Sequence, residues 1–475
     1  MKTSPQNESC VETLADAPNV AALVKEKIEE LDAQGCDEAF FIADLGDVVG
    51  KFVKWKELLP RVEPFYAVKC NQDETVVKLL AELGMGFDCA SKAEISQVVK
   101  MGVSPSRIIY ANPCKQKSFL KYAHKQSVDL MTFDNEAELI KIKALYPSAR
   151  LVLRLLPTSH FKVQCELGNK FGCHPDNVGK LLAQAQELDL NVMGISFHVG
   201  SGVEEAAAFS CAVKQAYEAW NMAQAYGFEM TLLDIGGGFP GQKSAPITFE
   251  EIASVLNQAL DMYFPKGSGV RIIAEPGRYF VASAFTLAVN IIAKRTVARD
   301  ISDNGGASVD GHHQQNVTRN DEPSHMYYVN DGVYGSFNSL MYDHAQVEAS
   351  VLEDPDAPQF SSSVWGPTCD GLDCILEDCH LPEMEVGQWM YFRDMGAYTM
   401  CAGSTFNGMP RPACFYFCRS SVWREVNGEP VAKRRCESLS ADGQFPAVLK
   451  AGMDFQSLHD AVCSIPVAPE ENMLA

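Results

Sequence analysis

The strongest constraint on the fold is a repeat of short apolar segments between about residues 45 and 283. Eight such segments, each rich in β-branched and aromatic residues, are predicted strands: 64–70, 86–91, 107–113, 129–135, 150–156, 193–200, 231–239 and 271–278. Between them, segments such as 73–86 and 177–189 carry apolar residues at helical spacing. Eight strand–helix units in this length predict an α/β fold, a (β/α)8 barrel of the TIM type. A doubly wound open sheet is the competing fold, but no glycine fingerprint follows the first strand.

The pattern changes after residue 283 to β-rich runs separated by turn signals. These runs are FTLAVNIIAKRTVA, HMYYVNDGVYG, SSSVWGP, QWMYFRDMGAYT and ACFYFCRSS. They predict a sandwich- or barrel-like β-domain over 284–425, beside a barrel over 46–283. Strands from residues 17–45, within an N-terminal segment 1–45, are expected to join the β-domain.

Two polar stretches are predicted to lack regular structure. Residues 300–325 are rich in Gly, Asp and Asn, which is typical of a mobile loop between strands. The paired His312 and His313 in this loop could bind a metal, but solvated loop histidines are commoner. No long periodic segment follows residue 430, so we predict a loosely ordered tail over 426–475.

Composition narrows the class of protein. The net charge of -21 argues against a nucleic-acid partner, because binding phosphates requires a basic face. No apolar run reaches the length of about 20 residues that a membrane helix needs, and no secretory signal is visible. The 16 cysteines are scattered, without disulfide-framework or zinc spacing. We therefore expect free thiols in a reducing compartment, the cytoplasm, and neither a metal site nor a membrane partner.

Polar residues follow the predicted strands at their carboxyl ends. They are Lys69, Asp88, Asn112, Asp134, Arg154, His198, Gly236 to Gly238 and Glu275. The carboxyl ends of barrel strands form one rim, where barrel enzymes carry their chemistry. One polar residue at a strand end is usually a cap, but a full set predicts an active site.

Lys69 ends the first predicted barrel strand. Burial there would lower the pKa of its amine towards the neutral form that Schiff-base formation needs, with Asp88 and Glu94 as possible charge partners. Taken alone, a strand-end lysine more often reaches solvent.

Two motifs on the last two predicted strands indicate a phosphate site. The run Gly236 to Gly238 lets backbone N–H groups approach a phosphate, and Arg278 could add a bidentate contact. A glycine run alone could equally form a tight turn. Glu275, two residues before Gly277, could keep a pyridine nitrogen protonated. His198 could stack on a flat ring, and Ser201 could bind phosphate. Only pyridoxal phosphate needs all of these groups together.

The predicted β-domain offers a second set of reactive groups. Cys369 and Asp370 lie in a Gly/Pro-rich turn, where the thiol could be exposed enough to donate a proton. A lone cysteine is more often a small buried apolar residue. Asp343, after Tyr342, and Asp370 could pair with a distal amine of a substrate, although turn aspartates are usually solvated.

Eleven sequence blocks place the chain in a family by resemblance. Spanning roughly residues 38–417 in order, they are PFYAVKCN, GFDCASKAE, ANPCK, FHVGSG, DIGGGFPG, AEPGRYF, VNDGVYGSFN, YDH, WGPTCDGLD, MGAYT and STFNG. They resemble the eukaryotic ornithine decarboxylase family. The resemblance implies a homodimer with active sites at the subunit interface, converting a small-molecule amino acid, ornithine, into putrescine and CO2. Three segments depart from the family: 155–172 and 300–325 look longer, and the tail 430–475 does not match the degradation tail.

The resemblance also implies residue roles. Lys69 would bind pyridoxal phosphate covalently, His198 would stack on its ring and Glu275 would pair with the ring nitrogen. The phosphate would be held by Ser201, Gly236, Gly237, Gly238, Arg278 and Tyr398, with Gly277 in the same site. Arg154 and Asp88 would lie near the cofactor. Asp343 and Asp370 would bind the distal ammonium, with Tyr334 and Tyr342 near the substrate, and Cys369 would protonate the α-carbon. Cys369 and Asp370 would come from the partner subunit, and Lys170 and Asp373 would pair across the interface.

Two alternatives remain open at this level. One is a non-catalytic antizyme inhibitor; the residues kept at cofactor and substrate positions argue against it. Segment 115–143 resembles the antizyme-binding region of the family, with Lys115, Lys117, Lys121, Lys125, Lys141 and Lys143 giving it local positive charge. The other is a decarboxylase of lysine or arginine, because one methylene changes discrimination by only about 1–3 kcal/mol.

Overall fold

The predicted barrel is confirmed by the structure, a computed structural model that describes residues 11–15, 19–158, 161–296, 324–352, 357–427 and 453–463. Its parallel strands are β3 (Val62–Ala67), β4 (Gly86–Cys89), β5 (Ile108–Tyr110), β6 (Leu130–Phe133), β7 (Arg150–Arg154), β9 (Asn191–Ser196), β11 (Leu232–Asp234) and β12 (Arg271–Ala274). β12 pairs with β3, Ile272 opposite Val62, so the sheet closes on itself and is not an open one.

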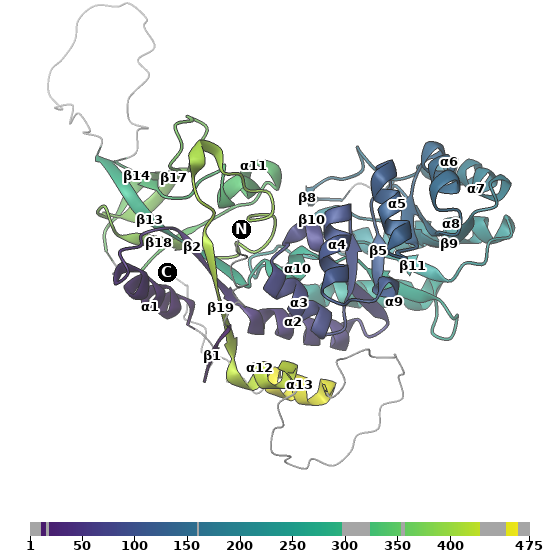
Figure 1. Ribbon diagram of the computed structural model, residues 1–475, viewed down its shortest axis with the longest axis horizontal. Helices are drawn as coiled ribbons and strands as arrows, with labels where there is room; N and C mark the ends of the chain where they lie inside the picture. Colours follow the sequence, from purple (N-terminus) through teal and green to yellow (C-terminus); the bar gives the residue numbers. More distant parts are fainter. Residues whose placement is uncertain are drawn as a thin grey trace, which may run out of the picture.

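Helices surround the barrel on the right of Figure 1. They are α2 (Leu45–Leu58), α3 (Glu74–Glu82), α4 (Lys92–Lys100), α5 (Lys117–Lys125), α6 (Glu136–Leu145), α7 (Val178–Glu187), α8 (Ala207–Ala225) and α9 (Phe249–Tyr263). Polar caps set where several begin: the side chains of Ser91 and Asn135 accept from the backbone of α4 and α6, and Thr248 forms a capping box with Glu251 on α9. The caps of α4 and α6 lie two residues beyond the ends of β4 and β6, so the rim loops there are short.

The β-domain is one mixed sheet, nine-stranded within the described ranges. Its strands are β1 (Val11–Leu14), β2 (Phe40–Asp44), β13 (Phe285–Thr296), β14 (His325–Val329), β15 (Ala349–Val351), β16 (Gln359–Trp365), β17 (Cys374–Pro382), β18 (Trp389–Phe392) and β19 (Ala413–Arg419). The order is β1-β19-β2-β13-β14-β16-β17, with β18 pairing β13 and β15. The long strand β13 follows the last barrel helix, α10 (Arg278–Val281), after a few residues and connects the domains.

The structure differs from the prediction in the N-terminal segment. Strands from residues 17–45 were expected to join the β-domain; β2 does so by pairing with β13 and β19, but a helix, α1 (Val20–Asp32), precedes it. Asn19 caps α1, and Leu23, Val24 and Ile28 bury one face at helical spacing. The alternating burial that a strand requires is absent there. The buried residues instead recur at helical spacing, which is why this segment forms a helix.

The C-terminal segment also contains regular structure. α12 (Ser420–Asn427) follows β19, and α13 (Phe455–Cys463) packs against α12 and α2, below the barrel in Figure 1. Leu458 is fully buried in this contact. A loosely ordered tail is therefore wrong for residues 455–463. The predicted loop 300–325 lies outside the described residues up to 323, including both histidines.

No helix in the described part of the chain combines the length and the apolar composition needed to span a bilayer.

The main core runs from the barrel helices into the sheet. In it, Trp55 stacks on Phe249 with ring centroids 5.3 Å apart, and its Nε1 donates to the carbonyl of Val62 at 2.9 Å. This packing anchors the lower end of β3, whose upper end leads to Lys69.

Candidate active site

A pocket opens at the carboxyl ends of β3, β9, β11 and β12. It is lined by Ala67, Lys69, His198, Ser201, Gly237, Gly238, Phe239, Glu275, Gly277, Arg278 and Tyr398. Residues up to 331 positions apart in the sequence, Ala67 and Tyr398, therefore meet in one place. The closed barrel brings most of them together because its strands end on the same rim, while Tyr398 comes from the β-domain, where its N–H donates to the carbonyl of Cys70 at 2.9 Å.

Lys69 lies two residues beyond the end of β3, in the 3-10 turn Val68–Cys70. Its Nζ forms an ion pair with Asp88, whose side chain is fully buried at the end of β4. Burial alone would lower the pKa of Lys69, but Asp88 and neighbouring acidic groups outweigh it and raise that pKa. The expectation of a lowered pKa is therefore wrong, because a carboxylate on the adjacent strand stabilises the ammonium. Glu94 instead accepts from the backbone N–H of Ala90 at 2.6 Å.

Buried carboxyl groups gather behind Lys69. Burial raises the pKa of Glu275 well above its ordinary value, and Asp234 and Asp88 raise it further. Burial likewise raises the pKa of Asp234 to about 7. One oxygen of Asp88 and one of Asp234 are buried without a hydrogen-bond partner among the described residues. This cluster favours a cationic group, such as a protonated ring nitrogen, beside Glu275.

Asp234 was missed by the sequence reasoning. It ends β11 and accepts from the N–H of Gly236 at 2.9 Å, so it fixes the start of the glycine run. The sequence feature that could have identified Asp234 is its position directly before Ile235 and the glycines.

The glycine run packs so closely on the loop after β9 that no side chain fits. A Cβ on Gly236, whose φ is +62°, would lie 2.0 Å from the carbonyl oxygen of Phe197. A Cβ on Gly237 would lie 2.8 Å from Nε2 of His198. Bare backbone therefore faces the pocket here, as a phosphate cradle requires.

His198 presents a flat, neutral ring to the pocket. Its Nδ1 accepts from the N–H of Gly200 at 3.1 Å. Burial lowers its pKa well below the ordinary value, and the charges of Arg154 and Lys69 lower it further. Arg154 itself lies at the end of β7, with its guanidinium 5.3 Å from the ring centre of Phe171.

Arg278 forms a two-pronged ion pair with Asp343, which lies at the end of α11 (Ser339–Tyr342) in the β-domain. Nη1 and Nη2 of Arg278 lie 2.8 and 2.6 Å from the two carboxylate oxygens. Nη2 also donates to Oγ of Ser201 at 2.9 Å, and the guanidinium lies 5.1 Å from the ring centre of Tyr398. The residue expected at the phosphate and the residue expected at the substrate thus contact each other.

The remaining predicted substrate residues do not line this pocket. Cys369 is exposed on the loop between β16 and β17, where its N–H donates to Asn407 at 3.1 Å. Asp370 accepts from the hydroxyl of Tyr334, and Tyr342 is 77% exposed.

Asp373 is buried within its own chain. Its carboxylate accepts from the N–H groups of Val333 and Thr368 at 2.8 and 2.9 Å. The expected pair of Asp373 with Lys170 across a subunit interface stays a prediction.

The pocket passes a chemical test for pyridoxal phosphate. A lysine amine matches the aldehyde of that cofactor, and a backbone cradle without side chains, beside an arginine, matches its phosphate. A flat imidazole matches its ring, and buried carboxylate oxygens without a partner match its ring nitrogen. Fold and pocket together define a barrel enzyme of the pyridoxal phosphate class.

Comparisons with known proteins give the family. Residues 45–282 match the family described as pyridoxal-dependent decarboxylase, pyridoxal binding domain. The chain is 53% identical to ornithine decarboxylase of Rattus norvegicus over 85% of each chain, and 52% identical to antizyme inhibitor 2 of Xenopus laevis over 85% of this chain and 86% of that protein. The crystal structure of arginine decarboxylase from Paramecium bursaria Chlorella virus aligns with a TM-score of 0.75 at 35% identity, covering 84% of this chain and all of that one. The chain belongs to the pyridoxal-dependent decarboxylases, in the group that contains the ornithine decarboxylases.

Proposed function

We propose that this enzyme decarboxylates L-ornithine to putrescine and CO2, the first step of polyamine biosynthesis, with pyridoxal phosphate as cofactor. The observation that carries the proposal is the pocket in which Lys69, Glu275 and the glycine run converge beside an acidic residue, Asp343, suited to a second amino group. Half of the sequence is identical to ornithine decarboxylases along most of its length.

Each side chain has a defined task in this proposal. When bound, the cofactor supplies an electron sink for the bond that releases CO2. Lys69 would hold its aldehyde carbon, Glu275 its ring nitrogen and His198 its ring face. Ser201, Gly236, Gly237, Gly238, Gly277, Arg278 and Tyr398 would hold its phosphate, with Asp88 and Arg154 alongside.

The substrate side of the site needs a second chain. Asp343 and Asp370 would bind the distal ammonium near Tyr334 and Tyr342, and the thiol of Cys369 would deliver a proton to the α-carbon. We infer a homodimer in which Cys369 and Asp370 act in the neighbouring subunit's pocket. Exposed apolar side chains in the β-domain support it: Met341 at 54%, Leu372 at 66% and Phe406 at 44% exposure.

The reaction is tested by measuring CO2 release from ornithine, lysine, arginine and leucine, each with purified protein and pyridoxal phosphate. We expect the highest kcat/KM for ornithine and none for leucine, because leucine lacks a distal amine. Higher activity with lysine or arginine would identify the alternative decarboxylases. No release from any substrate would favour the antizyme-inhibitor alternative.

Replacing Cys369 by alanine is expected to lower decarboxylation about 10²–10⁴-fold, the usual loss on removing a proton donor. Visible cofactor absorbance should be unchanged, because Cys369 does not line the cofactor pocket. Mixing this variant with Lys69→Ala tests the shared site. Random exchange makes half of the dimers mixed, each with one intact site, so activity should recover to about a quarter. No recovery after verified subunit exchange would contradict sites shared between subunits.

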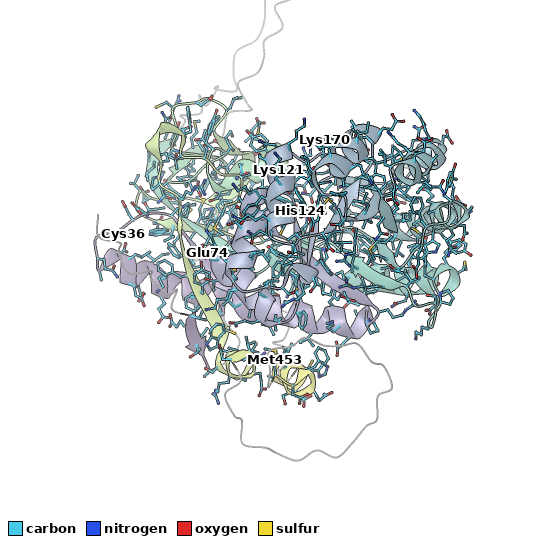
Figure 2. The ribbon with its side chains drawn as sticks, turned by 45° about the vertical axis from the view of Figure 1, so that its right-hand side comes forward. Cys36, Glu74, Lys121, His124, Lys170 and Met453 are labelled. Carbon is cyan, nitrogen blue, oxygen red and sulfur yellow. The ribbon has the colours of Figure 1, made fainter. Side chains whose placement is uncertain are left out.

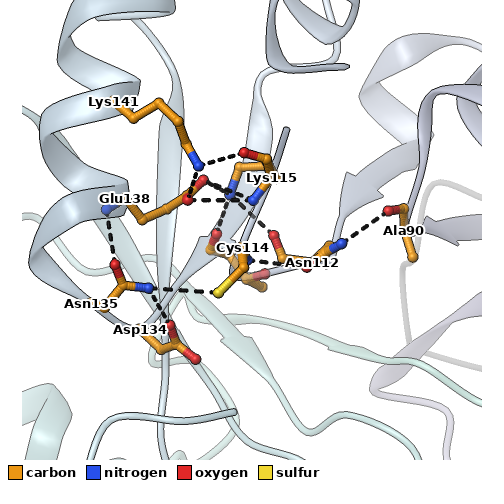
Figure 3. Close-up of polar contacts among 9 residues, drawn as sticks. Ala90, Asn112, Cys114, Lys115, Asp134, Asn135, Glu138 and Lys141 are labelled. Atoms are coloured by element: carbon orange, nitrogen blue, oxygen red, sulfur yellow. Dashed lines mark hydrogen bonds and ion pairs between the residues drawn. The ribbon is translucent and has the colours of Figure 1, made fainter. Parts of the chain in front are cut away.

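We propose that segment 115–143 binds antizyme. Fewer of its lysines present positive charge at the surface than expected, because Lys115 is fully buried and Lys141 pairs with Glu138 (Figure 3). Three lysines of α5 remain exposed beside His124: Lys117, Lys121 and Lys125. Figure 2 labels Lys121 and His124 on this helix.

We also propose that the protein is cytoplasmic. The free thiols of the described cysteines favour this location.

Charge reversal tests this surface. Lys121→Glu with Lys125→Glu should weaken inhibition by added antizyme by about tenfold or more in concentration, through like-charge repulsion with an acidic partner. Lys180→Glu, also an exposed barrel lysine, serves as the control. Inhibition unchanged by the double variant would place antizyme elsewhere.

A further inference from the structure

Gln164 lies on a short strand that covers the pocket rim. β8 (Val163–Cys165) pairs antiparallel with β10 (Ser201–Val203), with Cys165 opposite Ser201. The Gln164 side chain passes over Gly202, whose φ is +62°. A Cβ on that glycine would lie 2.7 Å from Oε1 of Gln164 and 2.8 Å from its Cβ. The glycine therefore leaves the space in which this amide sits.

The amide of Gln164 contacts Asp343 twice. Its Nε2 donates to the backbone carbonyl of Asp343 at 2.6 Å and to Oδ2 at 3.1 Å. The thiol of the next residue, Cys165, lies 3.3 Å from the same carbonyl. Because one donor group holds both the backbone and the carboxylate, it restrains the rotation of the Asp343 side chain relative to its own backbone, in addition to the two-pronged contact with Arg278.

This contact leaves Asp343 with limited capacity for other partners. A carboxylate offers about four acceptor positions. Arg278 occupies two, Gln164 a third, and the thiol of Cys165, 3.7 Å from Oδ1, the fourth. A thiol is a weak donor, so an incoming ammonium can replace this contact, in a direction that depends on the rotation of the carboxylate.

We propose that Gln164 is a positioning residue that aims the Asp343 carboxylate at the distal ammonium of a diamino-acid substrate. This inference rests on the proposed function, in which Asp343 binds that ammonium. Gln164 does not line the cofactor pocket. Its effect therefore falls on substrate binding, not on the chemical step.

The test compares Gln164→Met, which keeps the side-chain length and removes the donor, with the unaltered holoenzyme. KM for ornithine should rise about tenfold while kcat stays within about twofold, as for a lost hydrogen bond to a charged group. Cofactor affinity, titrated by visible absorbance, should stay unchanged. Gln215→Met is the matched control, because Gln215 contacts Thr158 in the same rim segment but not Asp343.

A binding measurement separates this inference from the reaction itself. By calorimetry on the holoenzyme, 1,4-diaminobutane should bind Gln164→Met about tenfold more weakly, whereas 1-aminobutane should bind both proteins equally. If the unaltered protein releases no CO2 from ornithine, the proposed function fails, yet the diamine comparison still reports on Gln164. Equal KM and equal diamine affinity in both proteins would overturn the role of Gln164. Gln164→Ala, with the melting temperature checked, serves as a second variant should Gln164→Met fold poorly.

Discussion

Replacing Lys69 by alanine is expected to abolish the visible absorbance of the bound cofactor and to lower decarboxylation by at least about 10³-fold. The reason is geometric: among the lysines of the described residues, Lys69 alone lines the pocket that holds the glycine run and Glu275. Absorbance spectra and CO2 release, measured on the same preparation, check both effects.

The matched control for this variant is Lys180→Ala. Lys180 is exposed on α7 and pairs with Glu136, so its removal should change activity by less than about twofold. Retained activity in Lys69→Ala at saturating cofactor would show that another amine carries the cofactor. Asp88→Asn tests the ion pair separately, because loss of this carboxylate should lower the pKa of Lys69 and shift the pH profile of cofactor attachment to lower pH.

Replacing Lys115 by methionine is expected to lower the free energy of unfolding by about 3–5 kcal/mol, the usual loss when one partner of a buried ion pair is removed. Nζ of Lys115 lies 3.0 Å from Oε1 of Glu138 and donates to the carbonyl of Thr132 at 2.6 Å. Burial lowers the pKa of Lys115 to about 8, which leaves it largely charged at neutral pH. Without it, Glu138 would keep Lys141 as its remaining cation in this cluster (Figure 3).

Denaturant unfolding at pH 7 measures this effect. Lys117→Met, two residues away and exposed, should change stability by no more than about 0.5 kcal/mol. Comparable stability of both variants would mean that the buried pair is replaceable without loss of stability.

The burial of Lys115 and Glu138 also bears on antizyme binding. Substituting either residue would alter the α5–α6 surface only by disturbing the fold.

The barrel was predictable because its signal is local. A strand buried on both faces is a continuous apolar run, and the first polar residue after it marks the rim. The family motifs then named most pocket residues. Helix α1 was missed because the prediction assigned strands to a segment whose apolar residues, Leu23, Val24 and Ile28, follow helical spacing.

What could not be predicted depends on neighbours that are distant in sequence. The sign of the Lys69 pKa shift is set by Asp88 on the next strand, not by the burial of the lysine. The contact of Gln164 with Asp343 joins residues 179 positions apart and has no local pattern. Asp234 had a local signal, but its importance follows from its proximity to Glu275.

The two places where the chain passes between barrel and sheet lie side by side. β2 ends at Asp44 and α2 begins at the next residue, while α10 ends at Val281 and β13 begins at Phe285. The two crossings are hydrogen-bonded to each other, since the N–H of Asp44 donates to the carbonyl of Ala284 at 2.8 Å. The barrel residues are therefore inserted between two strands of the sheet, β2 and β13, that pair with each other. The chain leaves the sheet and returns to it at one junction, so the barrel is held to the sheet by two covalent connections at the same place.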